Sequence, residues 1–360
     1  MPRLFPYVKM IAIISALDDL AKPPCSRILT YGVLLMGTDN FLLQVENLTT
    51  DFYTENGVIR AVDSVSFAVK PGEVLCLVGE SGCGKSVASY SILRLIPSPP
   101  GKIASGKVIF QGIDLLTITI NEMRHIRGKE IAMIFQEPLT SLNPLFTIGR
   151  QLGETLRLHQ KTNRKTTKRK SVQMLELVGI PRAEGVLSDY PHNLSGGMRQ
   201  RVMMAMALSC NPKLLIVDEP TTALDVTIQA QILALMKDVQ QKFGMAIIFI
   251  THDLGVVAEM ADRVVVMYAG KVVESAAVEA LFHQPSHPYT RGLLLSKPSL
   301  SAEKEKLDFI PGIVPSPLQM PTGCSFHPRC RQALEVCHRQ PPSLSEVRPG
   351  HLVRCWLYQD

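Results

Sequence analysis

Short apolar runs separated by polar turns occur along most of the chain. Residues 41–67 alternate between apolar and polar positions around a turn at Asn56-Gly57, which predicts two β-strands. Val74–Val78, Leu214–Val217 and Ala246–Ile250 are continuous apolar runs of the length typical of buried strands. Helical patterns lie between these runs, so the sequence predicts an α/β fold with a mostly parallel sheet.

The same pattern divides the chain into three parts. We expect an α/β domain at residues 39–285, which includes a helical subdomain at about 137–205, where strand-like runs are missing. Proline and glycine become frequent after this domain and mark a C-terminal extension at 286–360 with four cysteines. Residues 1–38 are expected to be a disordered or misassigned leader. A targeting segment is the alternative, because Met10–Leu17 is apolar, although two aspartates follow it directly.

Composition narrows the class of protein only a little. With 360 residues, 46% of them hydrophobic, the chain can bury a sizeable core. The net charge of +6 permits contact with an anionic membrane surface or a nucleic acid but requires neither. The apolar runs fall short of the roughly 18 residues that a membrane helix needs. Four of the eight cysteines crowd near the C-terminus and the other four are scattered, which is not the usage of a secreted disulfide scaffold.

A glycine-rich loop follows the predicted strand Val74–Val78. It reads GESGCGKS and matches the phosphate-binding pattern G-x-x-x-x-G-K-[ST]. Lys85 is expected to bridge the β- and γ-phosphates, and the Ser86 hydroxyl to bind Mg²⁺. The helix that follows would add the positive end of its dipole, and an ordinary glycine-rich turn is the alternative. The predicted nucleotide contacts are Gly79, Glu80, Ser81, Gly82, Cys83, Gly84, Lys85, Ser86 and Val87.

Two acidic residues, Asp218 and Glu219, directly follow the apolar run Leu214–Val217. Side chains at the carboxyl end of a parallel strand face a ligand bound at that edge of the sheet. We therefore assign Asp218 to Mg²⁺ and Glu219 to the general base that polarises the attacking water. For such a pair taken alone, a solvated acidic turn is the alternative.

The order of motifs resembles that of the ABC family of ATPases, because Leu194–Gln200 reads LSGGMRQ and lies between the phosphate loop and the acidic strand end. The resemblance implies a P-loop NTPase fold, an ABC-type nucleotide-binding domain with a RecA-like core, a helical subdomain and here a cysteine-rich tail. It also implies that Ser195, Gly196 and Gly197 contact the γ-phosphate of ATP held by a partner chain.

Further site residues follow from the same resemblance. Gln136 matches the glutamine that touches Mg²⁺ and senses the transporter, and His252 matches the switch histidine at the γ-phosphate. Asp225 matches the family's D-loop. Adenine is expected to stack on an aromatic residue upstream of the phosphate loop, for which Phe52 is favoured over Tyr53.

Segments outside the nucleotide motifs resemble the oligopeptide/dipeptide permease branch of ABC importers. They are QEPLTSLNP at 136–144, HPYTR at 287–291 and FHPRC at 326–330. The resemblance implies an ATPase at the cytoplasmic face of the inner membrane that energises import of di- and oligopeptides. It would pair with a sister or identical ATPase chain beneath two membrane permease subunits fed by a substrate-binding protein.

Other functions stay open at this stage. Nickel and glutathione are cargoes of some members of the same branch. The basic run at 161–170 permits a soluble ABC ATPase acting on nucleic acid, although a solvated helix face explains the run more simply. A regulatory module that binds ATP without cleaving it is a third alternative, against which Glu219 and His252 argue.

The C-terminal extension concentrates four cysteines, Cys324, Cys330, Cys337 and Cys355. Four thiolates suit a [4Fe–4S] cluster or zinc, but the close Cys pairs usual for zinc are missing. The resemblance to the peptide-permease branch favours the [4Fe–4S] cluster. Zinc and unligated thiols are the alternatives.

Overall fold

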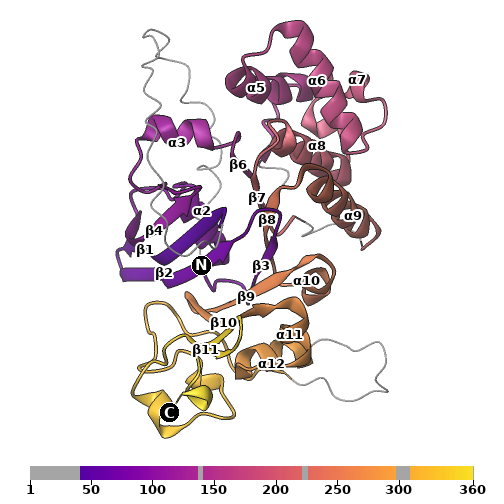
Figure 1. The fold of residues 1–360 in the computed structure, drawn as a ribbon. Coiled ribbons are helices and arrows are strands. Elements are labelled where there is room, and N and C mark those ends of the chain that lie inside the picture. Colours follow the sequence, from indigo (N-terminus) through magenta and orange to yellow (C-terminus); the bar gives the residue numbers. More distant parts are fainter. Residues whose placement is uncertain (1–40, 137–140, 221–225, 297–308, 360) are drawn as a thin grey trace.

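The computed structural model describes residues 41–136, 141–220, 226–296 and 309–359, and two β-sheets organise them (Figure 1). The smaller sheet is antiparallel, with strand order β2-β1-β4-β5. Its strands are β1 (Leu43–Thr54), β2 (Gly57–Val69), β4 (Gly101–Phe110) and β5 (Ile113–Asp114). The turn predicted at Asn56-Gly57 joins β1 to β2.

The larger sheet has eight strands in the order β11-β12-β10-β9-β3-β8-β7-β6. These are β3 (Val74–Val78), β6 (Ile131–Ile134), β7 (Leu214–Asp218), β8 (Ala246–Thr251), β9 (Arg263–Tyr268), β10 (Lys271–Ala277), β11 (Ser345–Arg348) and β12 (His351–Val353). Neighbouring strands from β9 to β6 run parallel, whereas β10, β12 and β11 add antiparallel pairs. The predicted mostly parallel sheet is therefore confirmed in its central part.

The central strands are buried on both faces, which explains their unbroken apolar sequences. Alternate residues of β3 enter two different cores. Val74, Cys76 and Val78 pack in the core that includes α8 and α9, while Leu75 and Leu77 pack in the core that includes the small sheet. Packing against both faces of β3 therefore fixes the position at which the following loop begins.

Helices surround the sheets and fill the chain between β6 and β7. They are α2 (Lys85–Ile92), α3 (Ile120–Ile126), α5 (Ile148–Gln160), α6 (Arg164–Leu177), α7 (Ala183–Val186), α8 (Gly196–Leu208), α9 (Val226–Phe243), α10 (Leu254–Met260), α11 (Val278–His283) and α12 (Pro288–Leu295). Helices α5 to α8 lie together at one end of the molecule (Figure 1). Within the described ranges, no helix has both the length and the apolar character needed to cross a bilayer.

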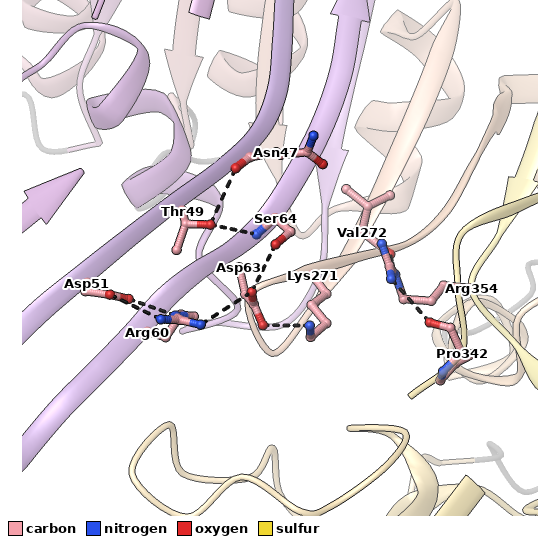
Figure 2. A network of polar contacts seen from close by, with 10 residues as sticks. All are labelled: Asn47, Thr49, Asp51, Arg60, Asp63, Ser64, Lys271, Val272, Pro342 and Arg354. Atoms are coloured by element: carbon pink, nitrogen blue, oxygen red, sulfur yellow. Dashed lines mark hydrogen bonds and ion pairs between the residues drawn. The ribbon is translucent and has the colours of Figure 1, made fainter. Parts of the chain in front are cut away.

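The C-terminal extension adds strands to the large sheet. β12 pairs with β10, and short 3₁₀ helices at His327–Arg329, Glu335–His338 and Trp356–Tyr358 shape the rest. Figure 2 shows Arg354 of this extension donating to the carbonyls of Val272 and Pro342. In the same view Lys271 of β10 forms an ion pair with Asp63 of β2, which ties the two sheets together.

The buried carboxylate of Glu274 links β10 to the C-terminal extension. Glu274 is fully buried and accepts hydrogen bonds from the backbone N–H groups of Ser286 and His287. Nε2 of His351 lies 2.7 Å from Oε1 of Glu274. A buried carboxylate is tolerated only when its oxygens are satisfied, so these contacts hold α12 and β12 against β10.

Candidate functional site

The phosphate loop connects β3 to α2 and can be built only with glycine at two positions. Gly84, the N-cap of α2, has φ +100°, and a Cβ placed there would lie 2.3 Å from the carbonyl oxygen of Ala61. A Cβ on Gly79 would lie 2.2 Å from the carbonyl oxygen of Met267. Among the described residues no side chain caps α2, so the first backbone N–H groups of this helix are available to an anion.

Lys85 lies within the curve of this loop. Its side chain is buried, and Nζ donates to the carbonyls of Gly79 at 2.7 Å and Glu80 at 3.0 Å. The Cys83 thiol lies beneath the loop with no exposed surface, and burial raises its pKa. The loop thus presents a cation and backbone amides on its open side, which is the arrangement that binds phosphate groups.

Ser86 and Asp218 meet at the mouth of the loop. The Ser86 hydroxyl donates to Oδ1 of Asp218 at 2.9 Å. Asp218 is fully buried at the end of β7, and this burial raises its pKa, although the hydroxyls of Ser86 and Tyr90 oppose the rise. Oδ2 of Asp218 is a buried oxygen that has no hydrogen-bond partner in the part of the chain that the structure describes. A hydroxyl and a carboxylate oxygen in this position fit Mg²⁺, a hard cation that prefers oxygen ligands.

Three predicted residues from three adjacent strand ends meet, because two of them contact the carboxylate of the third, Glu219. Oε1 of Glu219 lies 3.1 Å from Nδ1 of His252, and Oε2 accepts a 2.9 Å hydrogen bond from Nε2 of Gln136. Gln136 follows β6, Glu219 follows β7 and His252 follows β8. Glu219 also has φ +45°, a backbone conformation uncommon for residues other than glycine. Because this conformation is costly, it persists only where the surrounding structure holds the residue in place.

A cavity of about 610 Å³ brings the phosphate loop and this group together. Its lining contains most of the predicted contacts: Gly79, Glu80, Ser81, Gly82, Gly84, Lys85, Ser86, Val87, Gln136, Glu219 and His252. Cys83 and Asp218 are not in the lining because they are buried just behind it. Sequence reasoning missed Ala61, Leu254, Leu293 and Ser296, which also line the cavity. Leu293 belongs to α12, whose HPYTR segment was noted only as a family resemblance.

The LSGGMRQ segment at Leu194–Gln200, called the signature segment below, does not line this cavity. Ser195 caps α8, and its Oγ accepts a hydrogen bond from the Met198 N–H at 3.3 Å. Ser195 and Gly196 are exposed, and neither of them nor Gly197 lines the cavity. A helix N-terminus that is open to solvent suits an anion brought by another molecule.

The aromatic residues predicted to stack on adenine are not brought to the site. Phe52 lies on β1, half-buried and paired with Ile59 and Gly101, and it does not line the cavity. Tyr53, the alternative, is 52% exposed and does not line the cavity either. The adenine contact therefore stays a prediction, and Asp225 lies outside the described residues.

The four C-terminal cysteines lie close to one another but do not form a metal site as they stand. The pKa of Cys355 is raised to about 11, mainly by burial and further by the charges of Cys324, Cys330 and Cys337. Burial also raises the pKa values of Cys324 and Cys330. Within the described residues, no group of three or more His, Cys, Asp or Glu side chains is arranged to hold a metal ion. The structure therefore gives no support to the predicted [4Fe–4S] cluster or to zinc.

This fold and this site define an ATPase of the ATP-binding cassette class. The model of the family described as "ABC transporter" matches residues 62–222, and a shorter match to "AAA domain, putative AbiEii toxin, Type IV TA system" covers 190–258. A solved structure titled "Dimeric structure of a post-hydrolysis state of the ATP-binding cassette MJ0796 bound to ADP and Pi" is 26% identical, with a TM-score of 0.59. The match covers 66% of this chain and 98% of that one.

The C-terminal part narrows the class. The family model described as "Oligopeptide/dipeptide transporter, C-terminal region" matches residues 273–337. The chain is 54% identical to the "Oligopeptide transport ATP-binding protein AppD" of Bacillus subtilis (strain 168), over 89% of this chain and 97% of AppD. It is 49% identical to the "Dipeptide transport ATP-binding protein DppD" of Escherichia coli (strain K12), over 87% and 96%. The chain belongs to the oligopeptide/dipeptide transporter family of ABC ATP-binding proteins.

Proposed function

We propose that this protein is the ATP-hydrolysing subunit that powers import of di- and oligopeptides through a membrane permease. The convergence of Gln136 and His252 on Glu219, at the mouth of a phosphate loop, is the observation that carries the hydrolytic part. The peptide cargo rests on the names of relatives that match over nearly their whole length.

Each group at the site has a role in this proposal. Lys85 and the amides of the phosphate loop bind the β- and γ-phosphates, and Ser86, Asp218 and Gln136 would hold magnesium. When bound, Mg²⁺ neutralises phosphate charge and orients the oxygens. Glu219 accepts a hydrogen bond from the attacking water and takes up its proton. His252 keeps the Glu219 carboxylate oriented and contacts the γ-phosphate.

The signature segment takes part through a second ATPase chain. We propose that Ser195, Gly196 and Gly197 close over ATP held by the phosphate loop of a partner, because these residues start a helix outside their own cavity. The partner is an identical chain or a sister ATPase. The pair lies at the cytoplasmic face of the membrane beneath two permease subunits, and a substrate-binding protein delivers the peptide.

The proposed organisation along the chain keeps three parts. Residues 39–285 form the ATPase domain around a RecA-like core, with a helical subdomain at about 137–205, and 286–360 form the peptide-permease-type extension. Residues 1–38, for which a disordered or misassigned leader is expected, lie outside the described residues. The helices α5 to α8 within 148–208 support the helical subdomain, and β12 of the extension pairs with β10 of the ATPase domain.

No step of this cycle uses a metal group bound by the C-terminal cysteines. Anaerobic purification with iron, sulfide and zinc analysis tests the predicted [4Fe–4S] cluster directly. Iron and sulfide in equal amounts with broad visible absorbance would restore it, and a metal-free protein would leave unligated thiols.

Uptake of labelled di- and oligopeptides by cells lacking the gene tests the proposed function. We expect uptake to be lost, to return with the wild-type gene and not to return with Glu219→Gln. Unchanged peptide uptake in cells with no second peptide importer would overturn the cargo assignment. Nickel and glutathione uptake in the same strains then identifies the other cargoes of the branch.

A further inference from the structure

The first variable residue of the phosphate loop, Glu80, is anchored by the C-terminal extension. NH1 of Arg329 lies 2.6 Å from Oε2 of Glu80, and NH2 lies 3.1 Å from Oε1, although 249 residues separate the two in sequence. The backbone N–H of Glu80 donates to the Tyr289 hydroxyl at 2.9 Å, and its carbonyl accepts from Lys85. All three polar groups of Glu80 are thus engaged, two of them by residues beyond 285.

Arg329 reaches the loop through a rigid aromatic setting. Its guanidinium lies 5.8 Å from the ring centre of Tyr268, and its Nε donates to the Pro311 carbonyl. The rings of Tyr268, Tyr289 and Phe326 pack against one another with centroids 4.7 to 5.5 Å apart. With only 6% of its surface exposed, Arg329 has little freedom to leave this position.

The charge on Glu80 explains why such an anchor is useful. The Glu80 side chain is 30% exposed and lines the cavity in which the triphosphate is expected. A carboxylate there repels the phosphates, and this repulsion is strong where water is partly excluded. A bidentate guanidinium offsets the charge and also holds the carboxylate in one orientation.

We propose that Arg329 is a positioning residue for ATP binding, because it fixes Glu80 and neutralises it, so that the C-terminal extension sets the affinity of the phosphate loop. This inference rests on the proposed function in one respect, that the loop binds ATP. It goes beyond that function by assigning a role in the ATPase itself to the peptide-transporter C-terminal region.

Calorimetric titration of the full-length chain with Mg-ATP tests the charge argument. Arg329→Met keeps the volume but leaves Glu80 unpaired, and we expect Kd to rise about tenfold, as for loss of one partner of a hydrogen-bonded charge pair. Arg329→Lys keeps the charge without the fork and should raise Kd about threefold. Adding Glu80→Gln to Arg329→Met removes the repelling charge and should recover most of the affinity. In the assembled transporter, KM for ATP should rise in Arg329→Met while kcat stays within about twofold.

Arg354→Met provides a matched control. Arg354 is a half-buried arginine of the extension, and it donates to the backbone of β10 and of the extension itself. Its loss should lower thermal stability without changing Kd for Mg-ATP. An Arg329→Met or Arg329→Lys protein that binds Mg-ATP as the wild type does would overturn the inference, as would a double variant weaker than Arg329→Met alone. A wild-type chain that fails to bind Mg-ATP would instead overturn the proposed function.

Discussion

The Glu219 carboxylate and the His252 imidazole meet across the carboxyl ends of β7 and β8, with Oε1 3.1 Å from Nδ1. Gln136 binds the other oxygen of the same carboxylate, so its two oxygens are engaged by residues from two neighbouring strand ends. This arrangement orients the Glu219 carboxylate toward the cavity before any substrate arrives. A general base held in this way is expected to act on a water without reorganisation.

Replacement of Glu219 by glutamine should therefore separate ATP binding from ATP hydrolysis. Glu219→Gln keeps the size and a hydrogen-bonding oxygen but removes the base. We expect kcat for ATP in the assembled transporter to fall by about 10²- to 10⁴-fold, the range typical of a lost general base. The affinity for Mg-ATP, measured by calorimetry, should change little.

The control for this prediction is Glu130→Gln. Glu130 precedes β6 and pairs with Lys213 and Lys129, away from the cavity lining. Its replacement should leave turnover at the wild-type rate. Glu219→Gln turnover equal to that of Glu130→Gln would rule out Glu219 as the base.

Replacement of Ser195 should impair the site of the partner rather than the chain's own site. Ser195→Arg places a bulky cation at the open start of α8, where the proposed ATP of the other chain must dock. We expect ATP binding by the isolated chain to stay at the wild-type Kd and hydrolysis in the assembled transporter to fall at least tenfold. Ser188→Arg, at an exposed turn of the same helical region, should affect neither measurement.

The sequence predicted the parts of the site that depend on local geometry. The phosphate loop lies within eight consecutive residues, Gly79–Ser86, whose glycines determine its path. Gln136, Glu219 and His252 each follow a strand, and parallel strands bring such residues to one edge. Their convergence could therefore be expected from their order along the chain.

Contacts that depend on three-dimensional packing could not be predicted from the sequence. The Arg329–Glu80 pair joins the extension to the phosphate loop, and no periodic pattern indicates which of many charged residues will meet. Phe52 has the right residue type for adenine, but its strand register directs it toward Gly101. Four neighbouring cysteines and the resemblance to the peptide-permease branch likewise predicted metal binding, although among the described residues the thiols are not arranged as ligands.

Backbone geometry at Gly84 yields a prediction about stability. Gly84→Ala combines a positive φ with a Cβ only 2.3 Å from a backbone oxygen, so the loop must shift. Gly112→Ala has a similar strained φ of +81° with open space around the Cβ. We expect Gly112→Ala to cost about 1 kcal/mol of unfolding free energy and Gly84→Ala about 3 kcal/mol, in urea titrations without nucleotide. Equal losses would show that the clash with Ala61 is relieved without cost.

The junction of α12 with the sheet should weaken in acid because of His287. Full burial lowers the pKa of His287 to about 3, helped by the charge of Arg291 and opposed by a hydrogen bond with the backbone of Arg354. Its Nδ1 accepts the Tyr289 N–H at 3.0 Å, which requires an unprotonated nitrogen. In the unfolded chain the histidine titrates near its ordinary value of about 6.5. Between these two pH values, His287 is protonated in the unfolded chain but neutral in the folded protein.

Stability should accordingly be fully present above about pH 6.5 and fall as the pH drops toward 3, by at most about 1.4 kcal/mol per pH unit from this residue. His287→Asn keeps a side-chain oxygen that can cap α12 but does not titrate. Urea titrations of both proteins between pH 7 and pH 4 provide the comparison, since the contributions of all other groups cancel. We expect the variant to be less stable at pH 7 because packing is lost, and to show a flatter decline in acid. Parallel declines would mean that His287 is protonated in the folded protein as readily as in the unfolded chain.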